Sequence, residues 1–405
     1  MPDTLRRTLR QWDLIQIVIG SVIGSGIFLV PGVVLRQTGM DVGPALLVWI
    51  VAGVLSLLGA FTYGELCAMR PEAGGLYVFI REAFGPLPAF LFGWTLFLVI
   101  ASGAVATLAV AFSTYLGEIL PLSPLAARLV SVGMIAVVAA VNVRGTRHGA
   151  SVQNWSTAFK AGGILVMAAA LLWAGREWPA TLARLWPDSV SPTLLSGAGL
   201  AMIGVLWAYE GWQFVTYSAG EAVEPQRTFA RGIVIGTLAI VAIYTLANLA
   251  YLAALGPEAA ALSDRIAAEA MGALFGGAAG KLVAAAILVS VFSAANGVVL
   301  TAPRVFYAMA RDGIFFRKLA EVHPRFGTPA FAILAGALWA MVLAATGTFE
   351  QLLTYVVFAG WIFYALGALS VFHYRRHHPE AARPFRTPGY PLTPILFVAS
   401  AAALV

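Results

Sequence analysis

The chain has 405 residues, of which 60% are hydrophobic and only 11% are charged. A soluble domain needs far more charged surface, so this composition excludes a soluble globular protein and indicates an integral membrane protein. The formal net charge of +6 is explained by the lysines and arginines that membrane proteins carry in their cytoplasmic segments, so it predicts no nucleic acid partner.

Continuously apolar runs, each about 20 residues or longer, predict an all-α protein of ten complete transmembrane helices. A membrane β-barrel would instead show alternating segments of about ten residues. An eleventh run begins near residue 391 and stops at Val405, so we expect a truncated chain that forms a single transmembrane domain over 1–405. The ten runs lie at about 14–37, 43–68, 86–117, 125–142, 151–174, 193–219, 232–255, 280–310, 328–346 and 350–373.

The first run contains "GSVIGSGIFLVPG" (Gly20–Gly32), in which four glycines and a proline interrupt the apolar residues. Non-helical backbone at membrane depth is tolerated only where protein or a cavity covers it. We therefore predict a break in helix 1. Taken alone, the glycines also fit close packing between helices.

A second interruption, "GVLWAYEGWQ" (Gly204–Gln213), follows five helices later, in the sixth run. Paired breaks in two halves of five helices are typical of inverted-repeat transporters, which hold the substrate between the breaks. A half-helix amino end suits a carboxylate, and a half-helix carboxyl end suits an ammonium group. Together they favour an amino acid as the substrate.

The lysines and arginines indicate the orientation of the chain in the membrane. With the amino terminus inside, 18 of the 25 fall in cytoplasmic segments and six in external ones. This bias predicts a cytoplasmic amino terminus. The remaining one, Lys160, lies within the fifth run, where a buried lysine is a functional residue by default. The alternative is a side chain that snorkels to the cytoplasmic interface.

The sequence lacks the motifs of other functional classes. No H-E-x-x-H, G-x-S-x-G or P-loop sequence is present, so we expect neither an enzyme nor an ATP-driven pump. The charged rings and repeated filters of channels are also missing. The single cysteine, Cys67, excludes an internal disulfide, and we expect no metal and no cofactor.

Four stretches resemble the amino acid–polyamine–organocation superfamily of transporters. They are "GSGIF" (Gly24–Phe28), "YGELCAMRPEAGGLYVFIREAFGPLPAFLFGW" (Tyr63–Trp94), "GEAVEPQRTFARGI" (Gly220–Ile233) and "SAANGVVLTAPRVFYAMARDG" (Ser293–Gly313). They follow the family's order along nearly the whole chain. The resemblance implies a five-plus-five inverted-repeat (LeuT-like) fold with broken helices 1 and 6.

Two more stretches resemble the L-type amino acid transporter branch, which exchanges amino acids without sodium: "VQNWSTAFKAGGIL" (Val152–Leu165) and "IYTLANLAYLAAL" (Ile243–Leu255). Animal members join a heavy chain through a cysteine between helices 3 and 4. The corresponding loop, "GEILPLSPL" (117–125), has no cysteine. We expect no disulfide-linked heavy chain, and a prokaryotic permease that acts alone fits better.

The resemblance assigns substrate contacts to the two breaks. Backbone amides near Ser25, Gly26 and Ile27 are expected to bind the substrate carboxylate, and Trp207 takes the place of the family's aromatic gate. The carbonyls expected to receive the ammonium are those of Ile19, Val22, Trp207 and Ala208. For Trp207 the alternative is ordinary packing.

The resemblance also places Lys160 where sodium-coupled relatives hold sodium, between helices 1, 5 and 8, with Ser290 or Ser293 as its helix 8 neighbour. Tyr244 matches a tyrosine that links the substrate region to this lysine, with packing as the alternative. Glu210 departs from the glycine of animal L-type members. It either lines the pocket, where it attracts a cationic group or titrates, or it caps broken backbone.

The predicted function is sodium-independent transport of L-amino acids across the cell membrane, by exchange and alternating access. The alternative is a proton-coupled amino acid or polyamine permease. Besides the small-molecule substrate, the expected partner is membrane lipid. Gating or loop structure is expected of the charged residues at the cytoplasmic helix ends, which are Glu221, Glu224, Arg227, Arg304, Arg311 and Asp312.

Overall fold

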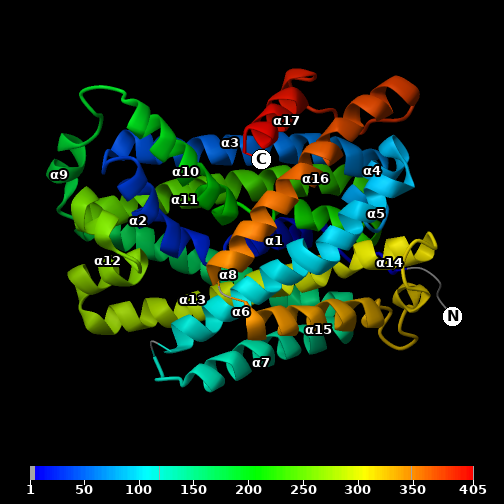
Figure 1. The fold of residues 1–405 in the computed structure, drawn as a ribbon, viewed down its shortest axis with the longest axis horizontal. Helices are drawn as coiled ribbons and strands as arrows, with labels where there is room; N and C mark the ends of the chain where they lie inside the picture. Colours follow the sequence, from blue (N-terminus) through cyan, green and yellow to red (C-terminus); the bar gives the residue numbers. More distant parts are fainter. Residues whose placement is uncertain (1–4, 118, 348, 405) are drawn as a thin grey trace.

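The computed structural model describes residues 5–117, 119–347 and 349–404, and the described part of the chain is helical (Figure 1). Within it no strand forms, and Leu9 and Ala222 make one isolated β-bridge. The helices, with η1 a π-helical turn and η2 and η3 3₁₀-helical, are α1 (Gln11–Val22), α2 (Gly26–Gln37), α3 (Val42–Met69), α4 (Leu76–Phe84), α5 (Pro86–Thr95), η1 (Leu96–Ile100), α6 (Ala101–Gly117), α7 (Pro124–Val143), α8 (Thr146–Ala174), α9 (Trp178–Ala183), α10 (Pro192–Ala208), η2 (Trp212–Glu221), α11 (Pro225–Leu262), α12 (Ile266–Phe275), α13 (Gly277–Thr301), α14 (Pro303–Arg311), η3 (Arg317–Ala320), α15 (Ala330–Thr346), α16 (Phe349–His377) and α17 (Leu392–Leu404).

Among the described residues, eight helices are long and apolar enough to cross a membrane, or nine if the bent pair α1 and α2 is one span. The expected ninth run corresponds to α15, an apolar helix of only 17 residues. Three short α-helices, α4, α9 and α12, lie in connections between the predicted runs. The multi-pass helical architecture is thus confirmed.

The outer helices turn apolar side chains away from the protein. On α8, Trp155, Val166 and Trp173 are 80%, 71% and 86% exposed. On α7, Leu125 and Leu129 are exposed by more than half. Large apolar surfaces of this kind match a lipid environment rather than water.

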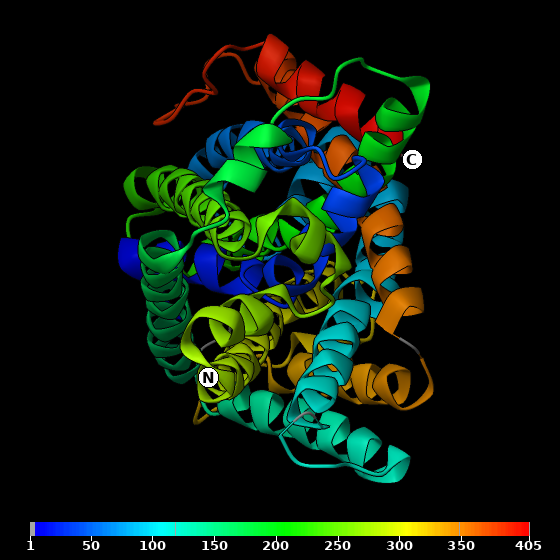
Figure 2. The ribbon, with the colours of Figure 1, turned by 90° about the vertical axis from the view of Figure 1, so that its left-hand side faces the viewer.

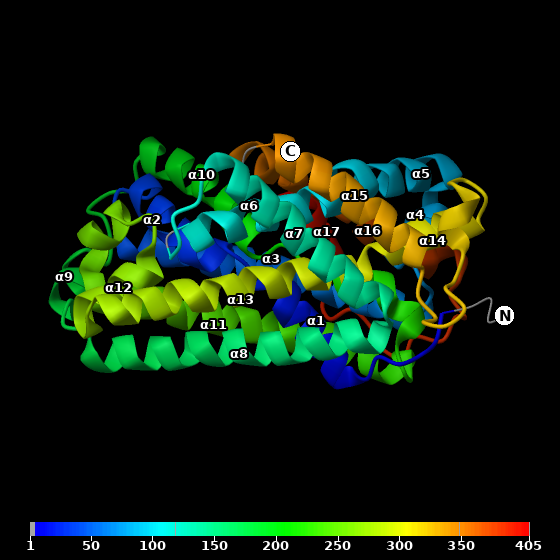
Figure 3. The same cartoon turned by 90° about the horizontal axis from the view of Figure 1, so that it is seen from below.

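The long helices run mainly along the horizontal axis of Figure 1. In Figures 1 and 2, α3 and α17 lie at one edge of the bundle and α7 and α15 at the other, with α1 between them. Inside the bundle α1 packs against α8, α11 and α13, and Figure 3 shows these last three side by side. Most of α1 is therefore buried, including the polar residues Asp13 and Gln16.

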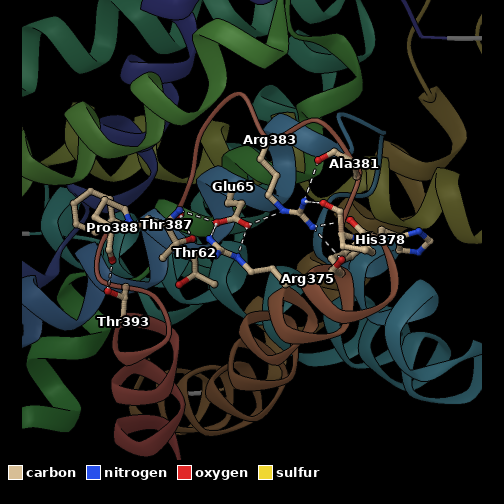
Figure 4. Close-up of polar contacts among 12 residues, drawn as sticks. Thr62, Glu65, Arg375, His378, Ala381, Arg383, Thr387, Pro388 and Thr393 are labelled. Atoms are coloured by element: carbon tan, nitrogen blue, oxygen red, sulfur yellow. Dashed lines mark hydrogen bonds and ion pairs between the residues drawn. The ribbon is translucent and has the colours of Figure 1, made fainter.

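We call the end of the bundle at which α1 begins the N-face. Here a buried carboxylate, Glu65 at the end of α3, holds the segment between α16 and α17 (Figure 4). Arg375 donates to both of its oxygens (3.0 and 2.7 Å), and the Thr387 amide donates to one of them (2.7 Å). Arg383 lies 3.5 Å from Glu65 and donates to four carbonyls of the turn 374–381.

A second polar contact at the N-face joins α4 to the end of α14. Tyr77 donates to the Asp312 carboxylate (2.7 Å), and Arg81 pairs with the same oxygen. Burial of the phenol, together with the nearby carboxylate, raises the pKa of Tyr77, so the hydroxyl keeps the proton that it donates. Charged residues of this face therefore hold helix ends together.

Candidate functional site

The first break separates α1 from α2. The carbonyl of Ile19 still accepts from the Ile23 amide (2.9 Å), after which the helix direction changes by 47° before α2 begins at Gly26. The Phe28 amide donates to the Ser25 carbonyl (3.1 Å). The amides that precede Phe28 at the start of α2 come too early for an intrahelical acceptor, so they face the break.

The second break follows α10, which ends at Ala208. Gly211 adopts φ +125°, a conformation that L side chains rarely take, and η2 then begins at Trp212. A Cβ atom at Gly211 would lie 2.8 Å from the backbone of Ser21. The second break therefore packs directly on α1.

The contact between the breaks is reciprocal, because Gly26 packs on Ala208. A Cβ atom at Gly26 would lie 2.6 Å from the Cα and Cβ atoms of Ala208, closer than real Cβ atoms come. The two interruptions, which are far apart in the sequence, therefore form one site.

Replacing Gly26 by alanine is expected to abolish transport, because the added methyl group meets backbone that no side-chain rotation relieves. Gly162→Ala is the matched control: this α8 glycine has nothing within 4 Å of an added Cβ, and alanine favours a helix by up to about 1 kcal/mol. Uptake by the two variants in proteoliposomes checks this. Wild-type uptake by Gly26→Ala would show that the breaks do not need their close contact.

A cavity of about 20 Å³ lies between the breaks, with room for about one water molecule. An amino acid does not fit this volume, so its binding requires the walls to separate. The structure is thus closed around the site. The cavity is lined by Ser21, Val22, Gly24, Ser25, Gly26, Ala104, Leu108, Trp207, Glu210, Phe214 and Val298.

Most of the residues expected to bind substrate meet at this cavity. The Ser25 hydroxyl is buried there without a hydrogen-bond partner, and Trp207 is 7% exposed. Ile19, Ile27 and Ala208 are buried but are not among the lining residues. Five of the eight residues expected to bind substrate therefore line the cavity, and Ile19, Ile27 and Ala208 do not.

Tyr244 of α11 connects the two breaks. Its hydroxyl lies 3.1 Å from the Val22 carbonyl and 3.0 Å from the Ala208 carbonyl. A hydroxyl has one proton to donate, so the two carbonyls share it. The ring packs against Trp49 and Tyr209, with centroids 5.6 and 5.1 Å away. Tyr244 thus contacts carbonyls expected to receive the substrate ammonium.

Lys160 of α8 is 2% exposed and reaches the first break from the side. Its Nζ donates to the carbonyls of Gly20 (2.6 Å), Ile23 (2.5 Å) and Ser290 (3.2 Å). An ammonium group carries three donors, and these three acceptors match them. The snorkelling alternative is therefore wrong, since the side chain turns inward and joins α1, α8 and α13.

Ser290 is the α13 serine that completes this contact. Its hydroxyl lies 3.1 Å from the Ile23 carbonyl and 3.4 Å from the Gly24 carbonyl. Ser293, three residues further along α13, is buried without a hydrogen-bond partner for its hydroxyl. Of the two candidates, the structure places Ser290 beside Lys160.

Glu210 faces the cavity between α10 and η2 and is 8% exposed. One carboxylate oxygen accepts from Gln213 (2.5 Å) and from Tyr364 of α16 (2.5 Å). The Gly211 amide donates to the Gln213 side chain (3.2 Å). Gln213, rather than Glu210, therefore caps the broken backbone, and Glu210 holds Gln213 in place.

Gln213 and Tyr364 were not among the residues singled out from the sequence. Asn296 of α13 was not singled out either. Its buried side chain accepts from Asn142 of α7 (2.8 Å) and donates to Gln153 of α8 (2.8 Å). A polar residue in an apolar run is the signal that marks each of these. Their partners lie on distant helices, so sequence alone did not connect them.

These observations define a class of protein: a multi-pass helical membrane protein with a small closed site between two helix breaks. The free amides at the start of α2 suit an anion. The carbonyls at the ends of α1 and α10 suit a cation. The site therefore has donors and acceptors for a small zwitterion.

The comparisons with known proteins narrow the class to a family. The model for "Amino acid permease" matches residues 9–405, and the chain belongs to this family. It is 32% identical to the serine/threonine exchanger SteT of Bacillus subtilis over 95% of this chain and 86% of that protein.

Mammalian relatives are about as similar. The human b(0,+)-type amino acid transporter 1 is 32% identical, covering 95% of this chain and 79% of that protein. The human cystine/glutamate transporter is 34% identical, covering 97% and 78% respectively. The predicted resemblance to amino acid transporters, including their L-type branch, is confirmed.

Proposed function

We propose that this permease exchanges L-amino acids across the cell membrane without sodium, by alternating access. The observation that carries the proposal is the closed cavity between the two helix breaks, with free amides on one side and carbonyls on the other. Its similarity to a serine/threonine exchanger favours exchange over uniport. No cofactor and no catalytic step takes part.

The substrate carboxylate binds the amides near Ser25, Gly26 and Ile27. The ammonium binds the carbonyls at the ends of the preceding half-helices, where Tyr244 already donates to two of them. Trp207 forms the aromatic gate, supported by its position in the cavity wall. The acceptor carbonyls proposed are those of Ile19, Val22, Trp207 and Ala208.

The helices are organised as a five-plus-five inverted repeat with ten complete spans in one transmembrane domain. The first repeat covers about 12–175 and the second about 191–374, and α17 follows as part of helix 11. Each repeat has a break in its first helix, after α1 in the first repeat and after α10 in the second, which supports this assignment. The N-face lies in the cytoplasm, an orientation that the bias of lysines and arginines supports.

Lys160 takes the place of a coupling sodium ion. A sodium site at a helix break is built from carbonyl and hydroxyl oxygens, and Lys160 contacts three such carbonyls beside the Ser290 hydroxyl. A fixed ammonium supplies the positive charge that the ion would bring. Uptake therefore needs no sodium gradient.

The permease acts without a disulfide-linked partner. Its one cysteine, Cys67, is fully buried in α3 and cannot reach a thiol on another chain. Membrane lipid and the small-molecule substrate are the remaining partners.

Glu210 gives the pocket a preference for cationic amino acids, because it brings a carboxylate to the cavity wall. We expect arginine to compete with labelled alanine in the wild type. In Glu210→Gln, about tenfold more arginine or higher should be needed for the same competition, because one charge-assisted contact is lost. Alanine exchange should persist. Equal arginine competition in both proteins would exclude Glu210 as the selecting group.

Exchange and proton coupling are distinguished in proteoliposomes of phosphatidylcholine and phosphatidylglycerol. Efflux of preloaded labelled alanine should require unlabelled amino acid outside and should not respond to an imposed pH gradient. Uptake into empty vesicles driven by a pH gradient would instead support the proton-coupled permease, which the buried Glu210 carboxylate makes the second candidate.

A further inference from the structure

A second cavity, of about 660 Å³, opens at the N-face, apart from the site between the breaks. Its walls come from three segments that are distant in the sequence. They are the segment that precedes α1, the turn between α7 and α8, and the turn before α15. Basic side chains line it from all three: Arg6, Arg144, Arg147, His148 and Arg325.

The lining contains no carboxylate to balance these charges. Arg147 pairs with Asp13 of α1 through a 2.9 Å contact. Within the described residues, Arg6, Arg144 and Arg325 form no ion pair, and all three are exposed. Three guanidinium groups therefore line one hollow without an acidic partner among the described residues, and that of Arg325 lies 5.5 Å from the centre of the Phe326 ring.

The turn that carries Arg144 is held by buried contacts. Gly145 adopts φ +145° and directly precedes α8, a helix of 29 residues whose first amides lack intrahelical acceptors. The Thr146 hydroxyl donates to the buried Glu221 carboxylate (2.7 Å) and accepts from Arg304 (2.8 Å). The positive end of α8 is thus fixed beside the arginines.

The other two walls are tied to this turn and to each other. The Thr328 hydroxyl donates to the Val143 carbonyl at the end of α7 (2.8 Å). The Arg6 side chain lies along Gly327, where a Cβ atom would be 3.5 Å from its Nε. The basic groups therefore sit on a preformed frame rather than on free loops.

We propose that this cavity binds a phosphate-bearing anion, either the headgroup of an anionic lipid or a free phosphate. One guanidinium group can donate two parallel N–H bonds to the oxygens of a phosphate, and several guanidinium groups around one hollow suit a tetrahedral anion. The cavity lies where α7 ends and α8 begins, two helices long and apolar enough to cross a membrane, and the ends of such helices meet lipid headgroups. Topology accounts for arginines at this face, but not for their convergence from three segments.

A bound phosphate would connect the segment that precedes α1 with α8 and α15. It would therefore stabilise the arrangement of the N-face seen here, in which these segments lie together. This inference does not depend on which amino acids the permease carries.

The test uses the purified full chain in a neutral detergent and follows its thermal unfolding midpoint. Inorganic phosphate and short-chain phosphatidylglycerol are titrated separately, with sodium chloride at equal ionic strength and short-chain phosphatidylcholine as controls. A ligand that binds the folded state raises the midpoint. The variants are Arg144→Gln/Arg325→Gln, the charge-preserving Arg144→Lys/Arg325→Lys, and Arg6→Gln, which keeps both turns intact if the double variant fails to fold.

Arg376→Gln is the matched control, since Arg376 is an exposed arginine of the same face outside the cavity. We expect the apparent affinity to fall about fivefold per arginine removed, and about 25-fold in the double glutamine variant. The lysine variant should bind more weakly than wild type but more tightly than the glutamine variant, and Arg376→Gln should bind as wild type does.

Stabilisation by phosphatidylglycerol alone identifies a lipid headgroup, and stabilisation by phosphate alone identifies a soluble anion. Stabilisation by both assigns recognition to the phosphate group itself. If neither ligand raises the midpoint of the wild type, or if the cavity variants and Arg376→Gln respond equally to it, the proposal is overturned and the arginines serve topology alone.

Discussion

Lys160→Ala is expected to abolish sodium-independent amino acid exchange. The substitution removes the donor that the carbonyls of Gly20, Ile23 and Ser290 share at a buried helix break, and of these three the Ile23 carbonyl keeps the Ser290 hydroxyl as a partner. Each unsatisfied group costs about 1–3 kcal/mol. A net loss of about 3 kcal/mol in the transport-competent arrangement corresponds to about a hundredfold in rate.

The measurement is uptake of labelled alanine into preloaded proteoliposomes in sodium-free buffer. Lys281→Ala removes an exposed lysine from the start of α13 and should leave uptake unchanged. Lys160→Met keeps most of the side-chain volume without the charge and should fail like Lys160→Ala, which separates the ammonium from simple packing. Unchanged uptake by Lys160→Ala would refute the role assigned to this lysine.

Arg304→Met is expected to be strongly destabilising. Arg304 and Glu221 are fully buried, with contacts of 2.6 and 3.2 Å, and Thr146 bridges them. Breaking a buried pair leaves an uncompensated charge, at a cost of about 3–5 kcal/mol. The pair joins the end of η2 to α14 and α8, so its loss should loosen the N-face.

The check is the thermal unfolding midpoint of the purified protein in detergent. Replacing both partners, in Glu221→Met/Arg304→Met, should cost less than Arg304→Met alone, because no buried charge is then left unpaired. The exposed pair Arg184–Glu258 is the matched control, and Arg184→Met should cost less than about 1 kcal/mol. A double variant less stable than Arg304→Met would contradict this account.

The sequence predicted the helical membrane architecture because apolar run length and helix-breaking residues are local signals. "GSGIF" and "WAYEGW" therefore located both breaks. Run length also predicted a span at 328–346, where the structure has the 17-residue helix α15, Ala330–Thr346. Composition alone does not show at which residue a helix begins.

The partners of the site residues could not be predicted in the same way. Ser290 and Ser293 lie three residues apart on α13, and only the packing against α1 shows which one meets Lys160. The hydroxyl of Tyr364 reaches Glu210 across 154 residues of sequence. Contacts of this kind depend on the rotation of each helix in the bundle, which apolar runs without a polar face leave undetermined.

The most direct test of a substrate site between the breaks uses Ser25→Cys. Ser25 lines the cavity, its hydroxyl has no partner to lose, and the native Cys67 is fully buried and does not compete for a thiol reagent. The rate of modification by a small methanethiosulfonate is measured in sodium-free buffer with and without alanine. We predict that alanine slows modification and that adding sodium has no further effect. Modification at the same rate with and without a transported amino acid would contradict binding at this site.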